Sequence, residues 1–466
     1  MSCQLLNNSA ALGFVSLLLL ARVGAYAAAE YPRAEMGPKS MGKVHEWKSK
    51  TGLAYTYFIP KSYTPKKGAN LTFVLHGSNL SRYWGFANHK AGVFRPDDVV
   101  VCPDGTTSNG QGGFNSLGKG EDLERFKALH DELKQTLKVR ATFLYGHSQG
   151  SFFAFHYAGA YPEEVQGVVG HASGVWTWTQ QGPGGHHQAI LLMHGTQDPV
   201  MPYSQSVGGA ESFRAAKYPT VRLRSLEGWN HWPAEHNSRT PHTSQQLAWC
   251  EGMITKDPER LSVSLNFLCA VRDKEWHDYA GAYALAQRAA KLKRFPSRLR
   301  KRASKAIRAI DKLAAAHVAA LKKSIRKNSS GNFDGKAWVG HAALFLRTFE
   351  GVPRCDAFAE EWSPVIERHK EDAIRHLRKY YKARKKGDEG EAFAEGILAV
   401  EKGGLYHECS DRRFLKQLHD WKEEAADLHL PAEALTRFEE IIPAYEKALE
   451  AGRQAFESIQ HKVMKF

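Results

Sequence analysis

Residues 141–153 have the sequence Ala-Thr-Phe-Leu-Tyr-Gly-His-Ser-Gln-Gly-Ser-Phe-Phe. The apolar run 141–145 predicts a buried strand, and the residues after Ser148 predict a helix, so a very tight turn must lie between them. A serine at the tip of such a turn has a strained backbone, and its neighbours two positions away must lack bulk. Gly146 and Gly150 meet that requirement. The stretch therefore predicts that Ser148 projects its hydroxyl from a strand end, above a helix N-terminus.

Strand patterns and helix patterns alternate on both sides of this turn. Short apolar runs rich in β-formers predict strands at 53–59, 71–75, 99–102, 165–169, 189–193 and 221–226. Apolar stripes at helical spacing predict helices at 121–139 and 203–217. This order predicts an α/β fold with a doubly wound, mostly parallel sheet covered on both faces. The loops at the carboxyl ends of its strands are then expected to carry the chemistry.

An acid and a histidine follow Ser148 in the order that a serine hydrolase of this architecture needs. Asp198 comes shortly after the strand predicted at 189–193, and His231 follows the last predicted strand. A neutral imidazole must take the serine proton, and a carboxylate must hold that imidazole in the right tautomer. We therefore predict a catalytic triad of Ser148, Asp198 and His231.

Weaker explanations of the same residues stay open at this point. Asp198 precedes a proline and also suits an ordinary turn. His236 and His242 are alternatives to His231, while His76 and His194 also fit as structural groups at strand ends.

The tetrahedral intermediate of ester or amide cleavage needs preorganised hydrogen-bond donors for its oxyanion. The backbone N–H of Gln149, which follows the nucleophile, is the first candidate. The second is expected from the loop after His76, where Ser78 is the first choice and Asn79 the alternative. Asn79 is also a candidate substrate contact.

At four places the sequence resembles a known family. These are His76-Gly77-Ser78, residues 146–150, the stretch 194–203 from His-Gly-Thr-Gln-Asp to Tyr, and His231-Trp232-Pro233. They resemble the α/β-hydrolase family of secreted polyhydroxybutyrate depolymerases and feruloyl or acetylxylan esterases, over roughly residues 45–254. The resemblance implies carboxylic ester hydrolysis through an acyl-enzyme, with neither a metal nor an organic cofactor. It does not extend to the C-terminal half, which differs from the β-rich modules often joined to polymer depolymerases.

Tryptophans gather in the loops predicted on the catalytic side. They are Trp84, Trp176, Trp178, Trp229 and Trp232. Aromatic side chains on loops stack against sugar rings or aryl groups, whereas tryptophans elsewhere usually cap the core. Trp229 and Trp232 flank His231, and these two are predicted to contact the substrate.

The N-terminus predicts export. An apolar segment within residues 5–29 ends in small residues, which is typical of a secretory signal, and Arg22 with Gly24 makes it too short for a membrane anchor. We expect a signal peptide at 1–29, a catalytic domain at 30–255, a C-terminal domain at 256–466, and a secreted or periplasmic protein. The five cysteines after the signal allow at most two disulfides, and they lack the CxxC spacing of a zinc site.

Residues 256–466 have the composition of a basic, all-α region. Helix breaks are expected near 295–296, 328–332, 352–353, 387–390 and 403–404. Between Lys291 and Lys327 there are 14 Lys or Arg residues and one acid, Asp311. Such a run is usually a solvated helix face. It also suits adhesion to an anionic cell-wall polymer or membrane surface, or packing over the catalytic half, whereas export disfavours nucleic acid as the partner.

The sequence therefore favours a secreted serine hydrolase of polysaccharide acyl, aryl or hydroxyalkanoate esters. A peptidase or amidase on the same fold is one alternative, although no motif for binding a charged terminus is present. A protein that binds anionic surfaces and carries an inert hydrolase domain is the other.

Overall fold

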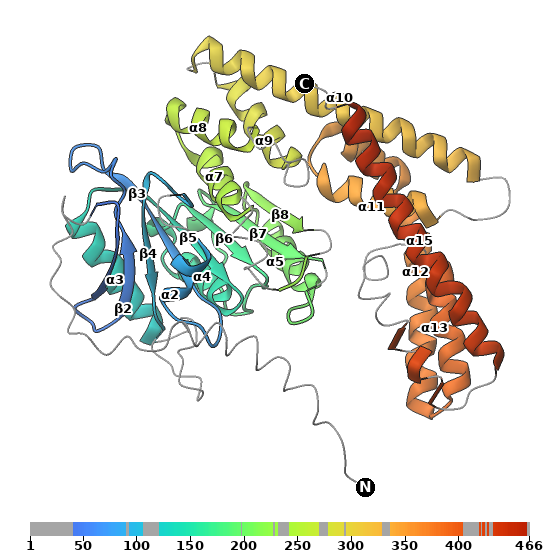
Figure 1. Cartoon of the computed structure of the whole chain (residues 1–466). Helices are drawn as coiled ribbons and strands as arrows, with labels where there is room; N and C mark the ends of the chain where they lie inside the picture. Colours follow the sequence, from blue (N-terminus) through green and yellow to red (C-terminus); the bar gives the residue numbers. More distant parts are fainter. Residues whose placement is uncertain are drawn as a thin grey trace, which may run out of the picture.

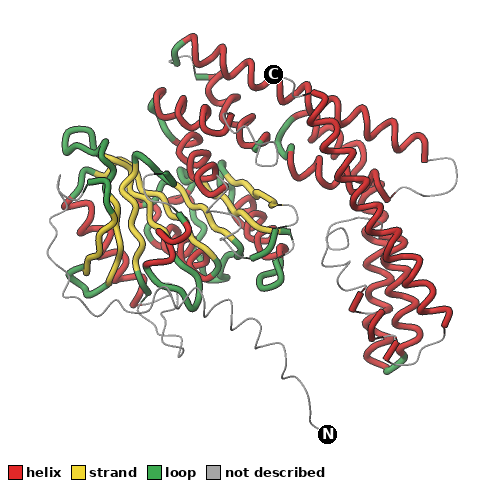
Figure 2. The backbone as a smooth tube through the Cα atoms, viewed as in Figure 1, coloured by secondary structure: helices red, strands yellow, loops and turns green. Residues whose placement is uncertain are grey.

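The computed structural model describes residues 41–89, 93–105, 121–196, 198–226, 229–231, 242–269, 278–292, 295–328, 336–403, 419–420, 422–424, 426–427 and 432–463. The predicted signal at 1–29 lies outside these residues. Within them the strands gather in one half of the molecule, and the other half is helical (Figure 2). The predicted fold class, an α/β hydrolase sheet followed by an all-α region, is confirmed.

One eight-stranded sheet forms the α/β half, in the order β1-β2-β4-β3-β5-β6-β7-β8 (Figure 1). Its strands are β1 (Val44–Lys48), β2 (Ala54–Phe58), β3 (Ala69–Leu75), β4 (Asp98–Pro103), β5 (Val139–His147), β6 (Gly167–His171), β7 (Ala189–Gly195) and β8 (Val221–Leu226). The β1–β2 and β2–β4 pairs are antiparallel, and every later pair is parallel. The carboxyl ends of β3 and β5 to β8 therefore lie along one edge of the sheet.

The central strands are buried on both faces because their side chains alternate between two cores. In β5, Phe143 and Tyr145 belong to one buried cluster, whereas Leu144 between them belongs to the other. Helices α3 (Glu121–Thr136), α4 (Gln149–Ala160) and α5 (Tyr203–Ala215) supply residues to the cluster of Leu144. Helices α2 (Tyr83–Asn88) and α7 (His242–Ile254) supply the opposite one. The sheet is thus doubly wound, as the continuous apolar runs predict.

The elements that were not predicted from the sequence include helix α7 and two short elements, β1 and α2. β1 consists of Val-His-Glu-Trp-Lys, and none of its side chains is fully buried. It forms the edge of the sheet, where buried and exposed side chains do not alternate clearly along the strand. Hydrophobic periodicity therefore gives little indication of a strand here. Helix α2 has only six residues, too few for a helical stripe to stand out.

The C-terminal half contains α8 (Pro258–Cys269), α9 (Tyr279–Lys291), α10 (Ser297–Asn328), α11 (Lys336–Thr348), α12 (Pro353–Lys386), α13 (Glu389–Gly403) and α15 (Ala432–Val463). The predicted helix breaks agree with the observed ends. Helix α12, for example, begins at Pro353 and ends before Gly387, which has the left-handed φ of 75° expected at such a position. Figure 1 shows α12, α13 and α15 extending away from the sheet, with α10 above α8 and α9.

The hydrophobic core runs from the sheet into the helices without a break. One buried cluster includes Phe143 of β5, Leu247 of α7, Leu285 of α9, Leu313 of α10 and Phe393 of α13. The domain boundary predicted at 255 falls in the connection between α7 and α8, two helices that both contribute to this cluster. The helices from α8 onward are therefore packed onto the sheet half, in part through α7.

Two further features concern the described residues only. Cys102, Cys250 and Cys355 are buried free thiols and Cys269 is an exposed one, so no disulfide joins any of the four. No helix in the described part of the chain is both long and apolar enough to cross a membrane.

Candidate active site

Ser148 lies in the turn between β5 and α4, where its backbone adopts φ 53° and ψ −121°. A non-glycine residue rarely has a positive φ, so the turn is strained in the way that the sequence predicts. The Ser148 N–H donates a hydrogen bond to the carbonyl of His171, at the end of the neighbouring strand β6 (2.8 Å). The turn is thus held at the carboxyl edge of the sheet.

The two glycines around Ser148 are required by close backbone contacts. A Cβ on Gly150 would lie 2.4 Å from the carbonyl oxygens of both Leu75 and His76. A Cβ on Gly146 would lie 2.4 Å from the Gly150 carbonyl oxygen. Neither distance is tolerable for a side chain, because all the opposing atoms belong to the main chain. The helix therefore starts directly against the end of β3.

The same edge brings Ser148 beside the loop after β3. A Cβ on Gly77 would lie 3.2 Å from the Cβ of Ser148, so this glycine leaves room for the serine side chain. Ser78, the next residue, donates a hydrogen bond from Oγ to Oε1 of Gln149 (2.8 Å). The two residues predicted to provide oxyanion donors thus lie next to each other at the mouth of the turn, and their roles stay a prediction.

Asp198 and His231 are 33 positions apart in the sequence, and the fold brings their side chains into contact. Nδ1 of His231 lies 2.7 Å from Oδ2 of Asp198, and both side chains are almost completely buried. The other carboxylate oxygen, Oδ1, accepts the N–H groups of Val200 and Met201 at 2.8 Å each. Because a carboxylate only accepts hydrogen bonds, Nδ1 of His231 carries a proton, and Nε2 is the ring nitrogen left to take up another.

Asp198 is strongly held in its charged form. Burial alone would raise the pKa of this carboxyl, but hydrogen bonds from His194 and His231 outweigh burial and lower the pKa well below its usual range. The negative charge is therefore present over the whole physiological pH range. It is available to stabilise an imidazolium at His231.

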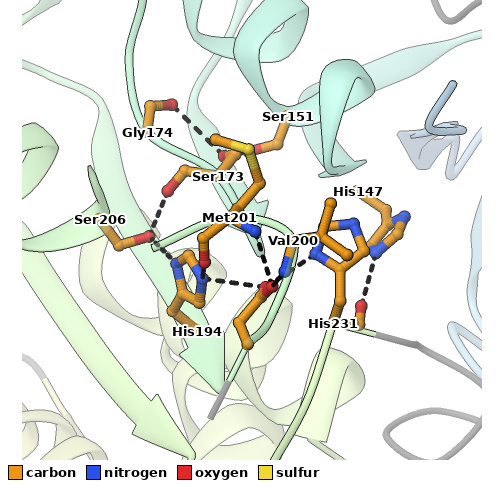
Figure 3. A network of polar contacts seen from close by, with 10 residues as sticks. His147, Ser151, Ser173, Gly174, His194, Val200, Met201, Ser206 and His231 are labelled. Atoms are coloured by element: carbon orange, nitrogen blue, oxygen red, sulfur yellow. Dashed lines mark hydrogen bonds and ion pairs between the residues drawn. The ribbon is translucent and has the colours of Figure 1, made fainter. Parts of the chain in front are cut away.

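His147 connects His231 to the serine turn. Its Nε2–H donates to the backbone carbonyl of His231 (2.9 Å), and the centroids of the two rings are 4.9 Å apart. The indole of Trp84 also stacks on the ring of His147, with centroids 5.3 Å apart. Since His147 immediately precedes Ser148, these contacts place His231 beside the serine turn. Figure 3 shows His147 and His231 side by side, with His194 farther along the network.

His194 is the residue whose importance sequence reasoning underrated. It lies at the end of β7 with none of its surface exposed, and its Nε2 is 3.0 Å from Oδ2 of Asp198. Asp198 therefore contacts two imidazoles rather than one. The signal was present in the spacing, since His194 is four residues before Asp198, but a strand-end histidine also suits a purely structural role.

The predicted substrate contacts are placed in different ways. Asn79 is exposed near the turn and has φ 62°. Trp229 is half-buried, and its ring makes an edge contact with His242 at the start of α7, with centroids 5.2 Å apart. His242, which the sequence offered as an alternative to His231, thus packs against Trp229. Trp232 and His236 lie outside the described residues.

Of the other tryptophans, Trp84 is buried and Trp178 is exposed. Trp84 is buried in α2, which agrees with a core role. Trp176 stacks between Phe152 of α4 and Trp178, with centroids 5.7 and 5.0 Å apart, and Trp178 is 47% exposed. Among the described residues, no group of three or more His, Cys, Asp or Glu side chains is arranged to hold a metal ion.

Comparisons with known proteins agree with this geometry. Residues 121–238 match a family described as phospholipase/carboxylesterase. The chain is 25% identical over 212 residues to a probable feruloyl esterase C of Aspergillus niger, covering 42% of this chain and 73% of that protein. For the probable feruloyl esterase C of Aspergillus oryzae the identity is 25% over 175 residues, covering 34% of this chain and 60% of that protein.

Solved structures of esterases are also similar, although at a low level. A thermostable esterase has 16% identity, covers 42% of this chain and 59% of its own, and gives a TM-score of 0.33. A serine-to-alanine mutant of the feruloyl esterase module from Clostridium thermocellum, solved in complex with sinapinate, is 13% identical to this chain. The match covers 44% of this chain and 89% of the module, with a TM-score of 0.34. The strand order gives the α/β half of this chain the fold of an α/β hydrolase, and residues 121–238 are similar to the phospholipase/carboxylesterase family.

Proposed function

We propose that the chain is a secreted serine hydrolase that cleaves carboxylic esters through Ser148, His231 and Asp198. The observation that carries the proposal is the 2.7 Å hydrogen bond between His231 and Asp198, next to a turn in which Ser148 has a φ of 53°. A strained serine at a strand end and a buried carboxylate–imidazole pair are the parts that acyl transfer requires.

The proposed reaction has two halves. Oγ of Ser148 attacks the ester carbonyl carbon while Nε2 of His231 takes the serine proton, and the resulting imidazolium then protonates the departing alcohol. The acyl group remains on Ser148. Water attacks this acyl-enzyme with His231 again as base, and the carboxylic acid leaves with the serine hydroxyl restored.

Backbone N–H groups are proposed to stabilise the charge that forms on the carbonyl oxygen. The N–H of Gln149 at the start of α4 and the N–H of Ser78 are the two donors. Each such donor is typically worth about 3 to 4 kcal/mol of barrier. The Ser78–Gln149 side-chain hydrogen bond supports the proposal, because it fixes the two donor-bearing segments relative to each other.

Aryl esters of the feruloyl type are the proposed substrates among the ester classes that the sequence suggests. Two of the relatives to which the chain is similar are probable feruloyl esterases, which supports this choice. So does the aromatic row Phe152–Trp176–Trp178, which starts one helical turn after Ser148 and ends in an exposed indole. A row of rings can stack on a hydroxycinnamoyl group or on a neighbouring sugar.

Labelling with a fluorophosphonate tests the catalytic assignment. We expect wild-type protein to be labelled and the Ser148→Ala variant to remain unlabelled. Labelling of the variant at an equal rate would refute the assignment of the nucleophile. Absence of labelling in folded wild type would instead support an inert hydrolase domain.

A substrate panel tests the bond and the acyl group. Methyl ferulate, p-nitrophenyl acetate, acetylated xylan, hydroxybutyrate oligomers and peptide amides are compared by kcat/KM. We expect methyl ferulate to exceed the others, and faster turnover of amides than of all esters would reject an esterase. Loss of preference for ferulate in Trp178→Ala, with p-nitrophenyl acetate unaffected, would assign the aromatic row to substrate binding.

A second role is proposed for α10, which is to attach the enzyme to an anionic polymer. Six basic side chains on one stripe of the helix are exposed: Arg298, Lys301, Arg302, Lys305, Arg308 and Lys312. The one acid of this segment, Asp311, pairs with Arg354 of α12 at 2.9 Å. Binding to acidic polysaccharide is expected to weaken steeply with salt, because neutralised polymer charges release counterions.

Charge reversal tests this second role separately from catalysis. Replacement of Lys301, Lys305 and Lys312 by Glu is expected to abolish retention on immobilised polygalacturonate at low salt while leaving kcat/KM for p-nitrophenyl acetate unchanged. Equal retention of variant and wild type would refute it. Export is tested by N-terminal sequencing of the secreted protein, for which we expect cleavage near Ala29.

A further inference from the structure

The loop between β3 and α2, residues 76–82, lies between two strand ends at one edge of the sheet. Strand β3 pairs in parallel with β5 on one side and with β4 on the other. Ser148 follows β5 and Asp104 follows β4, and the carboxyl ends of parallel strands share an edge. The loop that carries Ser78, the proposed second oxyanion donor, therefore has the serine turn on one flank and Asp104 on the other.

Asp104 binds the far end of this loop through Arg82. Its Oδ1 accepts the backbone N–H of Arg82 at 2.6 Å, and its Oδ2 accepts an N–H of the Arg82 guanidinium at 2.5 Å. The side chains of Asp104 and Arg82 are only 5% and 13% exposed, so water competes little for these bonds. One carboxylate thus holds both the main chain and the side chain of Arg82 through charge-assisted hydrogen bonds, which are the strong ones.

The carbonyl of Arg82 is held from β2. Oγ1 of Thr56, a buried residue of this strand, donates a hydrogen bond to the Arg82 carbonyl oxygen at 2.9 Å. The Arg82 guanidinium also donates to the hydroxyl of Tyr83 (2.6 Å) and lies 3.4 Å from Oε2 of Glu46 on β1. Both polar groups of the Arg82 main chain are therefore bound to buried side chains of other segments, at the point where α2 begins.

Asp104 is itself fixed to the sheet. Its N–H donates to the carbonyl of Ala54 at the start of β2 (2.8 Å). The residue before it, Pro103, is paired in register with Tyr55 of the same strand. The far end of the loop is therefore attached to the paired strands β2 and β4 rather than to another loop.

The tip of the loop is exposed. Ser78 and Asn79 both face solvent, and Asn79 has the left-handed φ of 62°. Residues other than glycine rarely adopt this conformation, and they keep it where the surrounding structure holds it. Ser78 bonds to Gln149 beside the serine turn, and Arg82 bonds to Asp104 on the opposite flank. The tip thus lies between two anchors.

We infer that Asp104 is a positioning residue for the proposed esterase reaction, because through Arg82 it holds the loop that presents the Ser78 N–H to the oxyanion. The inference rests on the proposed function. Preorganised donors act on the charge that develops on the carbonyl oxygen, so their placement affects the transition state more than the bound ester. A displacement of about 1 Å can cost about 100-fold in rate, and complete loss of a donor about 100- to 1,000-fold.

Asp98, at the opposite end of β4, provides a matched comparison. It is also buried, and its Oδ2 accepts the Nε–H of Arg95 and the hydroxyl of Thr72, each at 2.7 Å. Asp98 begins the strand, however, and lies at the edge of the sheet away from Ser148. Asp98 and Asp104 thus have similar partners at the two ends of one strand, and Asp104 is the one that binds the loop of Ser78.

Steady-state kinetics of Asp104→Asn and Asp98→Asn with p-nitrophenyl acetate test the inference. For folded Asp104→Asn we expect kcat and kcat/KM to fall by the same factor, roughly 10- to 100-fold, because the lost support acts in the transition state. Asp98→Asn is expected to unfold at a lower urea concentration than wild type but to keep its kcat. Equal kcat values in the two variants, or a kcat of Asp104→Asn within about twofold of wild type, would overturn the inference.

Thr56→Val provides a second variant of nearly the same shape. Valine cannot donate to the Arg82 carbonyl, so we expect a smaller loss of kcat, about 3- to 10-fold, with a matching loss of kcat/KM. If Asp104→Asn fails to fold, Thr56→Val decides the question, and wild-type kcat in this variant would then overturn the inference.

Amide hydrogen exchange over residues 77–82 supplies a readout that needs no activity. Asp104→Asn should exchange faster than wild type in this segment, whereas Asp98→Asn should not. Unchanged exchange in Asp104→Asn would overturn the inference whether or not the protein is an esterase. Failure of the proposed function appears separately, as folded wild-type protein without Ser148-dependent activity.

Discussion

His147 donates its Nε2–H to the backbone carbonyl oxygen of His231 across 2.9 Å. The residue before the proposed nucleophile thus contacts the main chain of the proposed base. His231 follows β8 in the chain, while His147 ends β5, so this hydrogen bond joins two segments that are 84 positions apart in sequence. Its loss should affect catalysis more than stability.

The first prediction tests this bond with His147→Phe. Phenylalanine keeps an aromatic ring against Trp84 but cannot donate to the His231 carbonyl. We expect kcat/KM for an aryl ester to fall by roughly 10 to 100-fold, mostly in kcat, because small displacements of a catalytic group have effects of that order. Thermal unfolding should change little. His147→Gln, which retains a donor, serves as the matched control and should recover part of the activity. Wild-type activity in His147→Phe would contradict the positioning role.

The second prediction concerns the serine turn. In Gly150→Ala the new methyl group would lie 2.4 Å from two carbonyl oxygens, so either the turn opens or the protein fails to fold. Fluorophosphonate labelling of any soluble protein should drop below about one per cent of wild type. Gly208→Ala is the control, since nothing lies within 4 Å of a Cβ at that position of α5. We expect Gly208→Ala to be neutral or to stabilise by about 0.5 to 1 kcal/mol.

The third prediction concerns the junction between β8 and α9. Asp278 caps the N-terminus of α9 by accepting the N–H of Gly281 (3.0 Å), and it also pairs with Arg222 (2.6 Å) while fully buried. Asp278→Asn would leave a buried guanidinium without its counter-charge, and we expect a loss of about 3 to 5 kcal/mol in the free energy of unfolding, measured with urea. Asp311→Asn breaks the exposed pair with Arg354 and should cost at most about 1 kcal/mol. Equal effects would contradict the importance of the buried pair.

The fourth prediction is a loss of stability in acid caused by the helical half. His317 and His341 form a buried pair with Nδ1 and Nε2 3.0 Å apart. Burial lowers the pKa of His317 to about 3 and that of His341 to about 4, so both rings are neutral in the folded protein. The unfolded chain takes up these protons near pH 6.5, so stability is present above that pH and is lost as pH falls from about 6.5 toward 4.

The expected size is about 2 kcal/mol for each histidine between pH 6.5 and 5. Comparison of urea unfolding at these two pH values in wild type and His341→Gln provides the measurement. The variant removes one titrating ring and should lose less stability on acidification, by about that amount. The same pH dependence in both proteins would show that His341 is not kept neutral by the fold.

The sequence was sufficient for most of the sheet because its buried strands are short, continuous apolar runs that end in Gly, Pro or Asp. The serine turn was predictable for a similar reason: a tight strand-to-helix turn at Ser148 excludes side chains at two fixed positions, and only glycine fits there. Helix breaks in the C-terminal half were predictable because Pro353 and Gly387 act through local backbone geometry.

The parts that were missed depend on contacts between distant segments. Edge strand β1 lacks an alternating pattern because its neighbour on one side is solvent. The contacts of His194 with Asp198 and with Ser206 of α5 become visible only once the chain has folded. Likewise, nothing in the order of residues indicates that His147 would bond to the main chain of His231.

The uninterrupted core between the sheet and the helices has a consequence for synthesis of the chain. Leu247 and Trp249 of α7 pack in the same cluster as Leu285 of α9, so a nascent chain that has emerged only as far as α7 presents these side chains to water. The α/β half would then be prone to aggregation until the helices that cover α7 have been synthesised. A gene truncated after codon 255 should therefore give an aggregating product, because the apolar side chains of α7 would lack their cover from α9.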